Sequence, residues 1–521
     1  MPSNKRNLIV VSNRLPLSVK RAEDGSYQSS LSSGGLVTSL SGLTKTTSFR
    51  WFGWPGINPK KETEREEVRR SLAVHDAVPV FLDEELAYEH YNGFSNSILW
   101  PILHYQSGVT FKEEPWVAYR RVNGIFAEEV ADAAQSGDLI WIHDYHLMLL
   151  PELLRERMAM KGKSAAIGFS LHTPFPAAQS LCVLPACKEI LEGMLSSSLV
   201  GFHTDEYKDN FVESCRRILF VIENCPNWLH RDAQSQDSKV QYRNRLVKTD
   251  KFVVGIDPQK FTDSLQKSEV QDRIRELKER YKNIKVIVGI DRLDYIKGLV
   301  QKLHGFELFL SGHPEWVGKV VLIQVAVPSR EDVKEYQELE SEINQTVGKI
   351  NGKFSMPHHT SRHLVWLLTP YTGGPDHTPI VYLHRPIPFT ELTALYSIAD
   401  ACLVASTRDG MNLVAFEYVA CQEKRHGVLV ISEFAGAAAF MGQGSITFHP
   451  ANPQEIANAI HKGLTMNGQD RQANYEKLKQ FVECNTRYVD HGFGAEISTN
   501  KLSSTVPGGD RLLLSNYRNA R

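Results

Sequence analysis

The sequence predicts an α/β protein with two doubly wound domains, each a mostly parallel sheet with helices on both faces. Short apolar runs rich in β-forming residues alternate with amphipathic segments along most of the 521 residues, and this alternation is typical of parallel sheets. So many runs suit two sheets better than one. A TIM barrel would also alternate, but its units are evenly spaced, and the long irregular stretch 34–138 breaks that spacing.

The hydrophobic pattern predicts where the elements lie. In the first half, strands are expected at residues 8–11, 139–142, 166–171 and 199–202. In the second half, they are expected at 286–290, 320–325, 380–383, 401–405 and 428–431. The clearest helix-like segments are 147–158, 271–281, 331–347 and 389–399.

A domain boundary is expected near residues 255–258 (GIDP), because a polar stretch precedes it and a new strand–helix series follows it. The first domain then covers residues 1–254 and the second covers 255–485. The end of the chain is rich in Ser, Pro, Gly and Asn from Lys501 onward, and residues 486–521 are expected to form a loose tail.

The bulk composition argues against some classes of partner. Apolar residues make up 42% of the chain and charged residues 23%, and the formal net charge is −1. The net charge of the chain therefore provides no overall electrostatic attraction to nucleic acid or to an anionic membrane, and we expect neither as a partner. No apolar run is long enough to span a bilayer. The seven cysteines are scattered and odd in number, which favours a reduced, cytoplasmic protein.

Ligands of open parallel sheets bind outside the carboxyl ends of the strands, so the segments that follow the strands are the first candidates for a site. The first strand is followed by Arg14 and later by Gly34 and Gly35. A glycine pair of this kind lets the backbone approach a phosphate, but it is equally a plain turn.

Histidines follow two further strands of the first half. His143 and His146 flank Asp144 after the 139–142 strand, and His172 follows the 166–171 strand. Side chains of this kind bind a sugar hydroxyl, ligate a metal or simply cap a strand. The spacing of His143 and His146 matches no recognised metal pattern, which disfavours the metal.

In the second half, Arg292 and Lys297 follow the 286–290 strand. An arginine and a lysine in this position can converge on a diphosphate. The alternative is a surface ion pair of either one with Asp291 or Asp294. Arg330 follows the 320–325 strand and is another cation at a strand end.

The segment 406–413 runs from the 401–405 strand into a helix that contains Glu417. Asp409 and Gly410 lie in this segment, whose free N–H groups and positive dipole end favour an anion. Glu417 is in position to accept hydrogen bonds from two ribose hydroxyls, but a helix carboxylate is more often solvated.

No Asp-x-Asp triplet, which often holds a diphosphate through a divalent ion, occurs in the chain. Arginine, lysine and a helix N-terminus would then stabilise a departing nucleoside diphosphate without a metal. The chain has no Walker motif, and no G-x-G-x-x-G follows a strand, which disfavours ATPase and NAD-binding functions. We therefore expect no metal and no cofactor.

Twelve ordered segments carry a resemblance to a known family. They are 12–16, 34–36, 51–56 (WFGWPG), 91–105 (YNGFSNSILWPILHY), 138–151 (DLIWIHDYHLMLLP), 167–176 (IGFSLHTPFP), 199–204, 255–258, 291–298 (DRLDYIKG), 324–333 (QVAVPSREDV), 406–418 (STRDGMNLVAFEY) and 432–437 (SEFAGA). In this order they resemble the trehalose-6-phosphate synthases, the UDP-forming α,α-trehalose-phosphate synthases of glycosyltransferase family 20. They cover most of residues 8–485, so the resemblance is specific.

The resemblance implies two Rossmann-like domains facing across a cleft, the GT-B fold. It implies a retaining glycosyltransferase that moves glucose from UDP-glucose, a co-substrate, onto glucose 6-phosphate to make trehalose 6-phosphate. In that family the departing phosphate is usually proposed to help deprotonate the incoming hydroxyl, so no carboxylate nucleophile is assigned.

The resemblance also implies roles for individual residues. The expected glucose 6-phosphate contacts are Arg14, Tyr91, Trp100, Asp144 and Arg330. The expected UDP-glucose contacts are Gly34, Gly35, Arg292, Lys297, Asp409, Gly410, Met411, Asn412, Leu413, Val414, Ala415, Phe416 and Glu417. His172 is expected beside the transferred glucose, and the expected catalytic residues are His172, Asp144, Arg292 and Lys297. Trp51 and Trp54 either line the substrate site or pack in the hydrophobic core, and we favour the core.

Three stretches depart from the family pattern. An atypical insert of about 20 residues lies near 355–376, as a surface loop or as translated intron sequence, and residues 180–189 carry Ala186 and Cys187 where Val and Arg are expected. The resemblance is also lost from Phe493 onward.

Two other functions remain open. A catalytically weak or regulatory subunit of a trehalose-synthesis complex should lack some of these contacts, and a GT-B transferase for another acceptor should lack the arginines suited to a phosphate. The resemblance allows a trehalose-6-phosphate phosphatase, regulatory subunits or a second copy of the chain as partners.

Overall fold

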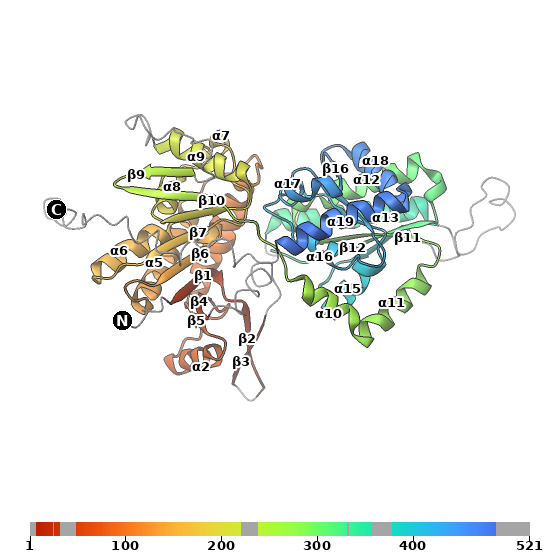
Figure 1. Ribbon diagram of the computed structural model, residues 1–521. Coiled ribbons are helices and arrows are strands. Elements are labelled where there is room, and N and C mark those ends of the chain that lie inside the picture. Colours follow the sequence, from red (N-terminus) through yellow and green to blue (C-terminus); the bar gives the residue numbers. More distant parts are fainter. Residues whose placement is uncertain are drawn as a thin grey trace.

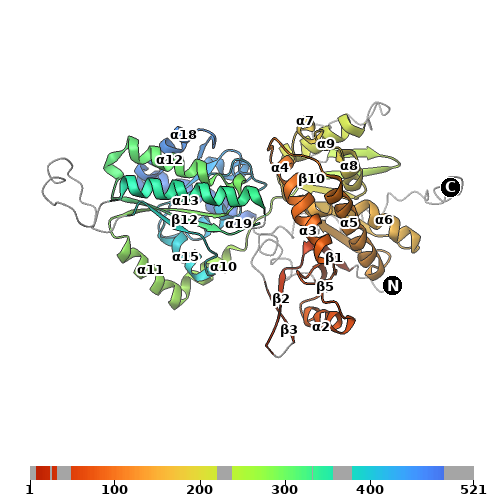
Figure 2. The same cartoon turned by 180° about the vertical axis from the view of Figure 1, so that it is seen from behind.

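The computed structural model describes residues 7–23, 26–31, 48–219, 238–330, 333–355 and 378–485. They form two lobes that lie side by side in both views, the first in red to yellow and the second in green to blue (Figure 1, Figure 2). Each lobe is built on its own sheet of mainly parallel strands. The predicted α/β class with two sheets is confirmed. The change from one sheet to the other falls between Lys251, the end of β10, and Pro258, the start of α10.

The first sheet has eight strands in the order β5-β4-β1-β6-β7-β8-β10-β9. They are β1 (Leu8–Arg14), β4 (Phe49–Trp54), β5 (Ala77–Pro79), β6 (Leu139–His143), β7 (Ala166–Ser170), β8 (Leu199–Phe202), β9 (Ser238–Tyr242) and β10 (Arg245–Lys251). All pairings are parallel except that of β9 with β10. A separate hairpin joins β2 (Leu17–Arg21) to β3 (Tyr27–Leu31).

The helices of this lobe are α2 (Glu62–Ala73), α3 (Glu84–Tyr88), the π-helix η2 (Glu89–Leu99), α4 (Trp100–Leu103), α5 (Glu113–Ala133), the 3₁₀ turn η3 (Tyr145–Leu147), α6 (Leu150–Met160), α7 (Ala178–Leu181), α8 (Cys187–Leu195) and α9 (Asp205–Leu219). Alternation along β1 shows how the sheet is covered. Ile9 and Val11 pack in one core with α5, α6 and α8, whereas Val10 packs in a second core with α2 on the other face.

The second sheet has six strands, all parallel, in the order β13-β12-β11-β14-β15-β16. They are β11 (Lys285–Arg292), β12 (Val320–Val327), β13 (Ile380–Leu383), β14 (Ala401–Val404), β15 (Val428–Ser432) and β16 (Ile446–Phe448). Its helices and 3₁₀ turns are α10 (Pro258–Gln266), α11 (Ser268–Arg280), η4 (Tyr295–Lys297), α12 (Leu299–Gly312), η5 (Pro314–Trp316), α13 (Lys334–Phe354), α15 (Phe389–Ile398), α16 (Val414–Ala420), α17 (Ala438–Met441), η6 (Gly442–Gly444), α18 (Pro453–Thr465) and α19 (Gly468–Cys484).

The second sheet is also buried on both faces. Val286 and Val288 of β11 pack with α10, α11, α15, α16 and α19, whereas Ile287 packs with α12, α13 and α18. Every predicted strand of both halves is present, with ends that differ by up to three residues. None of the helices in the described residues is both long and apolar enough to cross a membrane.

The hydrophobic pattern did not predict β2, β3, β4, β5, β9, β10 or β16. β5 and β16 have three residues each, too few for a hydrophobic period to stand out. β10 alternates Val247 and Thr249, both fully buried, with charged neighbours, so it lacks the apolar run of a central strand. The expected helix 331–347 begins at Lys334 and continues to Phe354. The atypical insert at 355–376, apart from Ser355, and the tail at 486–521 lie outside the described residues.

Candidate functional site

The carboxyl end of β6 places Asp144 in an unusual backbone conformation, with φ of 76°. Non-glycine residues with positive φ concentrate at functional sites, and Arg330 and Asn412, both expected site residues, share this property with φ of 54° and 72°. One carboxylate oxygen of Asp144 accepts a hydrogen bond from the backbone N–H of His172, at 3.3 Å. Burial raises the pKa of Asp144 to about 6. The ends of β6 and β7 are therefore joined through this carboxylate.

Arg14 ends β1, where its guanidinium lies over the indole of Trp54, 5.0 Å from the ring centroid. Gly56 has φ of +83°, and a β-carbon there would lie 2.4 Å from a guanidinium nitrogen of Arg14. The WFGWPG segment thus supports the arginine by a cation–π contact and by a glycine that leaves room for it. Trp51 is a core residue, 6% exposed, and its indole N–H donates to Ser12 Oγ.

The π-helix η2 brings polar side chains to the end of β6. Its residue Tyr91 stacks on the ring of His146, with centroids 5.5 Å apart, and Asn96 Oδ1 accepts a hydrogen bond of 2.8 Å from the Tyr145 hydroxyl. Trp100 follows η2 directly and starts α4. Eleven residues of π-helix are rare, and π geometry recurs at functional sites. Asn96 was not predicted, because an asparagine within a helix gives no sequence signal of its own.

On the other lobe, Lys297 reaches Asp409 with an Nζ–Oδ2 distance of 2.5 Å. The hydroxyl of Ser406 and the amide of Asn412 also donate to Asp409 Oδ2. Burial alone would raise the pKa of Asp409, but the Lys297 ammonium and these hydrogen bonds lower it to about 2. Asp409 is therefore a carboxylate that holds Lys297 at the carboxyl end of the second sheet.

The predicted alternative, a pair of Lys297 with Asp291 or Asp294, is wrong. Asp291 instead pairs with Lys302, and both are almost fully buried. Arg292 lies 3.5 Å from Asp294 but remains 45% exposed, so part of its fork of donors faces solvent. An exposed, loosely paired guanidinium is available to an anionic ligand.

Arg330 is buried, with its side chain 2% exposed, and donates to Asp294 Oδ2 at 3.1 Å. It also crosses between the lobes, because it donates to the Tyr145 hydroxyl at 3.3 Å and lies over the Trp100 ring at 4.2 Å. Arg292 lies over the same ring, at 5.5 Å. Trp100 of the first lobe thus receives two guanidinium groups from the second.

Glu417 lies on α16 and accepts a hydrogen bond of 2.9 Å from the Tyr396 hydroxyl. Burial raises its pKa to about 7. The alternative of a solvated helix carboxylate is wrong for this residue. A buried carboxylate with one hydroxyl partner retains acceptor capacity for further hydroxyls, as a ribose would require.

This raised pKa predicts how Glu417 affects stability. The carboxyl is protonated more readily in the folded chain, so its charged form costs stability, and the cost grows as the pH rises from about 4.5 through about 7. Relative to wild type, Glu417→Gln should be nearly neutral at pH 4.5 and stabilising by about 1–3 kcal/mol at pH 8. Denaturant unfolding at the two pH values measures the difference. An identical difference at both would contradict the buried, titrating carboxyl.

Further contacts join the carboxyl ends of the two sheets. The Tyr207 hydroxyl of α9 donates to the backbone oxygen of Asp409 at 3.0 Å. A β-carbon on Gly410 would lie 2.0 Å from the carbonyl oxygen of His172, so only glycine fits there. The segment 409–412 of the second lobe and His172 of the first lobe are thus brought together. Tyr207 was missed because a tyrosine in an amphipathic helix resembles any core residue.

Buried polar atoms without a protein partner occur among the expected site residues as well as elsewhere in the described parts of the chain. Those that belong to residues named here are Trp54 Nε1, Asn96 Nδ2, Trp100 Nε1, His143 Nε2, His146 Nε2, Arg330 Nε and Asn412 Oδ1. Leaving a buried donor or acceptor unpaired costs about 1–3 kcal/mol each. Such groups are typical of a site that is completed by a polar ligand.

The structure brings together Asp144, His172, Trp100, Arg292 and Arg330, and it places Lys297 with Asp409, Asn412 and Glu417 on the same edge of the second sheet. Five further expected contacts lie between Asp409 and Glu417 in sequence: Met411, Leu413, Val414, Ala415 and Phe416. Three of them, Met411, Ala415 and Phe416, are buried in the core. Gly34 and Gly35 lie outside the described residues.

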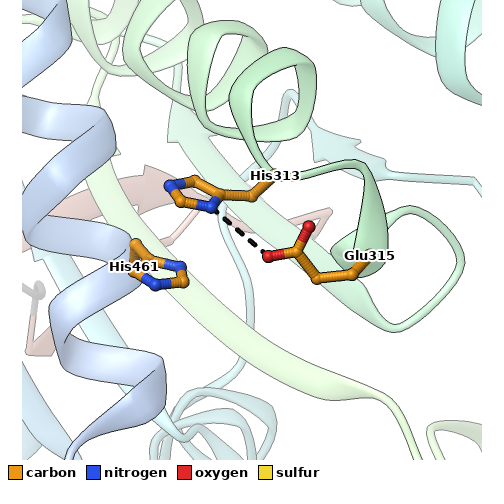
Figure 3. Close-up of side chains that lie close together, drawn as sticks. All are labelled: His313, Glu315 and His461. Atoms are coloured by element: carbon orange, nitrogen blue, oxygen red, sulfur yellow. Dashed lines mark ion pairs between the residues drawn. The ribbon is translucent and has the colours of Figure 1, made fainter.

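His143 and His146 do not share a group of potential metal ligands in the described parts of the chain. One such group occurs there, formed by His313, Glu315 and His461 beside α12 and α18 (Figure 3). Nδ1 of His313 lies 3.3 Å from the Glu315 carboxylate. The two imidazoles, however, are stacked 3.8 Å apart at 5°. Parallel rings one above the other cannot both aim an in-plane lone pair at one ion, so this group is an ion pair with a stacked neighbour.

Comparisons with known proteins show the family of the chain. The family model of glycosyltransferase family 20 matches residues 6–489. An α,α-trehalose-phosphate synthase [UDP-forming] of Emericella nidulans is 50% identical over 97% of this chain and 94% of its own length. The corresponding protein of Schizosaccharomyces pombe is 50% identical over 92% of this chain and 88% of its own.

Solved structures share the fold. A trehalose-phosphate synthase of Burkholderia xenovorans in complex with glucose 6-phosphate has a TM-score of 0.77 at 28% identity, covering 95% of this chain and 100% of that one. The N-terminal domain of a Candida albicans trehalose-6-phosphate phosphatase has a TM-score of 0.79 at 29% identity, covering 92% and 94%. The predicted GT-B arrangement is confirmed, and the chain belongs to glycosyltransferase family 20.

Proposed function

We propose that this chain transfers glucose from UDP-glucose to glucose 6-phosphate with retention, giving α,α-trehalose 6-phosphate and UDP. The observation that carries the proposal is the Trp100 ring of the first lobe, which lies under Arg292 and Arg330 of the second. Arg292 and Arg330 of the second lobe therefore reach the strand ends of the first lobe. Two phosphorylated substrates that meet between the lobes would require cations in this position. The two relatives at 50% identity carry this activity in their names.

The donor would be held by its charges. Lys297 and Arg292 neutralise the diphosphate, and Glu417 accepts hydrogen bonds from the ribose. As the bond from the anomeric carbon to the phosphate oxygen breaks, the same cations stabilise the charge on the departing UDP. That phosphate takes the proton of the incoming hydroxyl on the face that it leaves, so no carboxylate nucleophile is required.

The acceptor would lie at the ends of β1 and β6. Asp144 is in position to hold a sugar hydroxyl, and Arg14 on Trp54 is in position to bind the phosphate. A regulatory subunit with this fold should have lost some of these groups. The likeness to the phosphatase N-terminal domain concerns the fold, whereas the charged residues of both substrate sites are present in this chain. The described cysteines are all free, which supports a reducing, cytoplasmic setting.

Product analysis tests the proposal. Purified protein, UDP-glucose and glucose 6-phosphate should yield one disaccharide phosphate whose two anomeric protons both show the small coupling of an α linkage. A β-linked product would contradict retention. No product from any hexose phosphate, with UDP still bound, would favour a regulatory subunit. A trehalose-6-phosphate phosphatase is the partner class to test first, because such an enzyme would consume the product.

We further propose that no metal or other cofactor takes part in the transfer, because Arg292 and Lys297 supply the charge that a divalent ion would otherwise provide. Turnover should survive EDTA at a concentration far above that of any contaminating metal. UDP release in EDTA, with and without added Mg²⁺ or Mn²⁺, measures this. Complete loss in EDTA that either ion restores would show that the diphosphate is held through a metal.

A further inference from the structure

Four neighbouring strands of the first sheet end in one row of hydrogen bonds. His143 ends β6, His172 follows β7, His203 follows β8 and Phe252 follows β10, and these strands are adjacent in that order. Nδ1 of His143 lies 2.9 Å from Nε2 of His172, and Nδ1 of His172 lies 3.2 Å from Nε2 of His203. Nδ1 of His203 lies 3.1 Å from the Phe252 carbonyl oxygen. The row thus crosses the sheet from strand to strand.

The row has only one consistent direction when the rings are neutral. A carbonyl oxygen can only accept, so Nδ1 of His203 carries a proton and its Nε2 is an acceptor. Nδ1 of His172 must then be the donor to His203, which makes Nε2 of His172 an acceptor from Nδ1 of His143. The row ends at Nε2 of His143, which is buried and has no partner.

The surroundings keep the rings neutral. His143 is fully buried and His203 is 3% exposed. Burial lowers the pKa of His172 to about 4 and that of His203 to about 3. Burial also lowers the pKa of His143, and His172 adds to this effect. All three rings are therefore uncharged near neutral pH, and each carries its proton on Nδ1.

Both ring nitrogens of His172 therefore lie within hydrogen-bond distance of a neighbouring imidazole. What His172 offers to the junction of the lobes is its backbone. Its N–H donates to Asp144, and its carbonyl oxygen lies against Gly410 of the second lobe. The ring is therefore an anchor for a peptide group that touches both halves of the site.

We propose that His143 and His203 are positioning residues for the transfer reaction, acting through His172: the row fixes the His172 ring, and with it the backbone between Asp144 and Gly410. This proposal rests on the glucosyl transfer proposed above.

Matched substitutions separate hydrogen bonding from packing. His143→Leu removes the donor to His172, whereas His143→Asn keeps an N–H near the position of Nδ1. His203→Leu removes the acceptor, whereas His203→Gln keeps an oxygen near the position of Nε2. Each Leu variant should lose about tenfold or more in kcat, the order expected for one broken buried hydrogen bond. KM for both substrates should change by less than about threefold, because His143 and His203 are proposed to act through the His172 ring. The Asn and Gln variants should recover most of the loss.

Two results would overturn the positioning role. One is full turnover in the Leu variants. The other is a loss in kcat that the Asn and Gln variants share and that follows the thermal unfolding midpoint, as a packing role would produce. Imidazole ¹⁵N NMR of the wild-type protein tests the direction of the row without any activity. His172 should be neutral at pH 7 with its proton on Nδ1, and a proton on Nε2 would overturn the proposal. A wild-type protein that releases no UDP while showing this tautomer would contradict the proposed function instead.

Discussion

Lys297→Ala should lower kcat/KM for UDP-glucose by roughly 10- to 150-fold, since a charge-assisted contact contributes about 1.5–3 kcal/mol. The loss should appear in turnover as well as in UDP affinity, because the charge on the leaving diphosphate grows as the bond breaks. Steady-state kinetics and UDP titration measure the two parts. Unchanged kinetics would show that Lys297 serves only its ion pair with Asp409.

The ion pair requires a control, because Lys297→Ala also leaves the buried Asp409 without its cation. The double variant Lys297→Ala/Asp409→Asn removes the unpaired charge but does not restore a cation. Its stability should exceed that of Lys297→Ala. Recovery of wild-type turnover in the double variant would show that the loss arose from the stranded carboxylate and not from the diphosphate.

The second large effect concerns the acceptor. Wild-type protein should prefer glucose 6-phosphate over glucose by at least about 100-fold, since each charge-assisted contact to the phosphate contributes about 1.5–3 kcal/mol. Arg14→Ala should reduce this preference, and Asp144→Ala should lower transfer to both sugars alike. Competition between the two acceptors, read by product mass, gives the ratio.

Arg21 offers a matched control for Arg14. It lies on β2, is largely exposed and pairs with Glu64 at the surface. Arg21→Ala should leave the acceptor preference unchanged. An equal fall of the preference in both variants would mean that general charge, and not a contact at the end of β1, selects the phosphorylated sugar.

Arg330, an expected contact of glucose 6-phosphate, has a side chain that is only 2% exposed. It is enclosed by Asp294, Tyr145 and Trp100, so Arg330→Ala should disturb the contact between the lobes as well as acceptor binding. Its position after a buried strand was visible in the sequence. Its burial was not, because two of the residues that cover it, Tyr145 and Trp100, come from the other lobe.

The fold was predictable wherever a strand is buried on both faces. β11, β12 and β15 each contain a run of three or four consecutive Val, Ile or Leu residues, and such runs are distinct in a sequence. The edge strands β5 and β9 and the π-helix η2 were not predictable, because three residues or a polar pattern give no period. Their positions follow from the neighbours against which they pack.

The site was predictable as a set of strand ends, but the pairing of its residues was not. Asp409 is separated from Lys297 by more than a hundred residues, and the choice between Asp294 and Asp409 depends on how β11 and β14 lie in the sheet. The row of His143, His172 and His203 was missed for the same reason. Each histidine alone is an ordinary strand-end residue, and only the order β6-β7-β8 makes them a row.

The most direct test of the central claim is the release of UDP from UDP-glucose with and without glucose 6-phosphate. The arrangement of Arg292 and Arg330 over Trp100 predicts that UDP appears rapidly only when both substrates are present, with one trehalose 6-phosphate formed for each UDP. UDP release at the same rate without the acceptor, or none with it, would contradict a transferase that joins these two substrates.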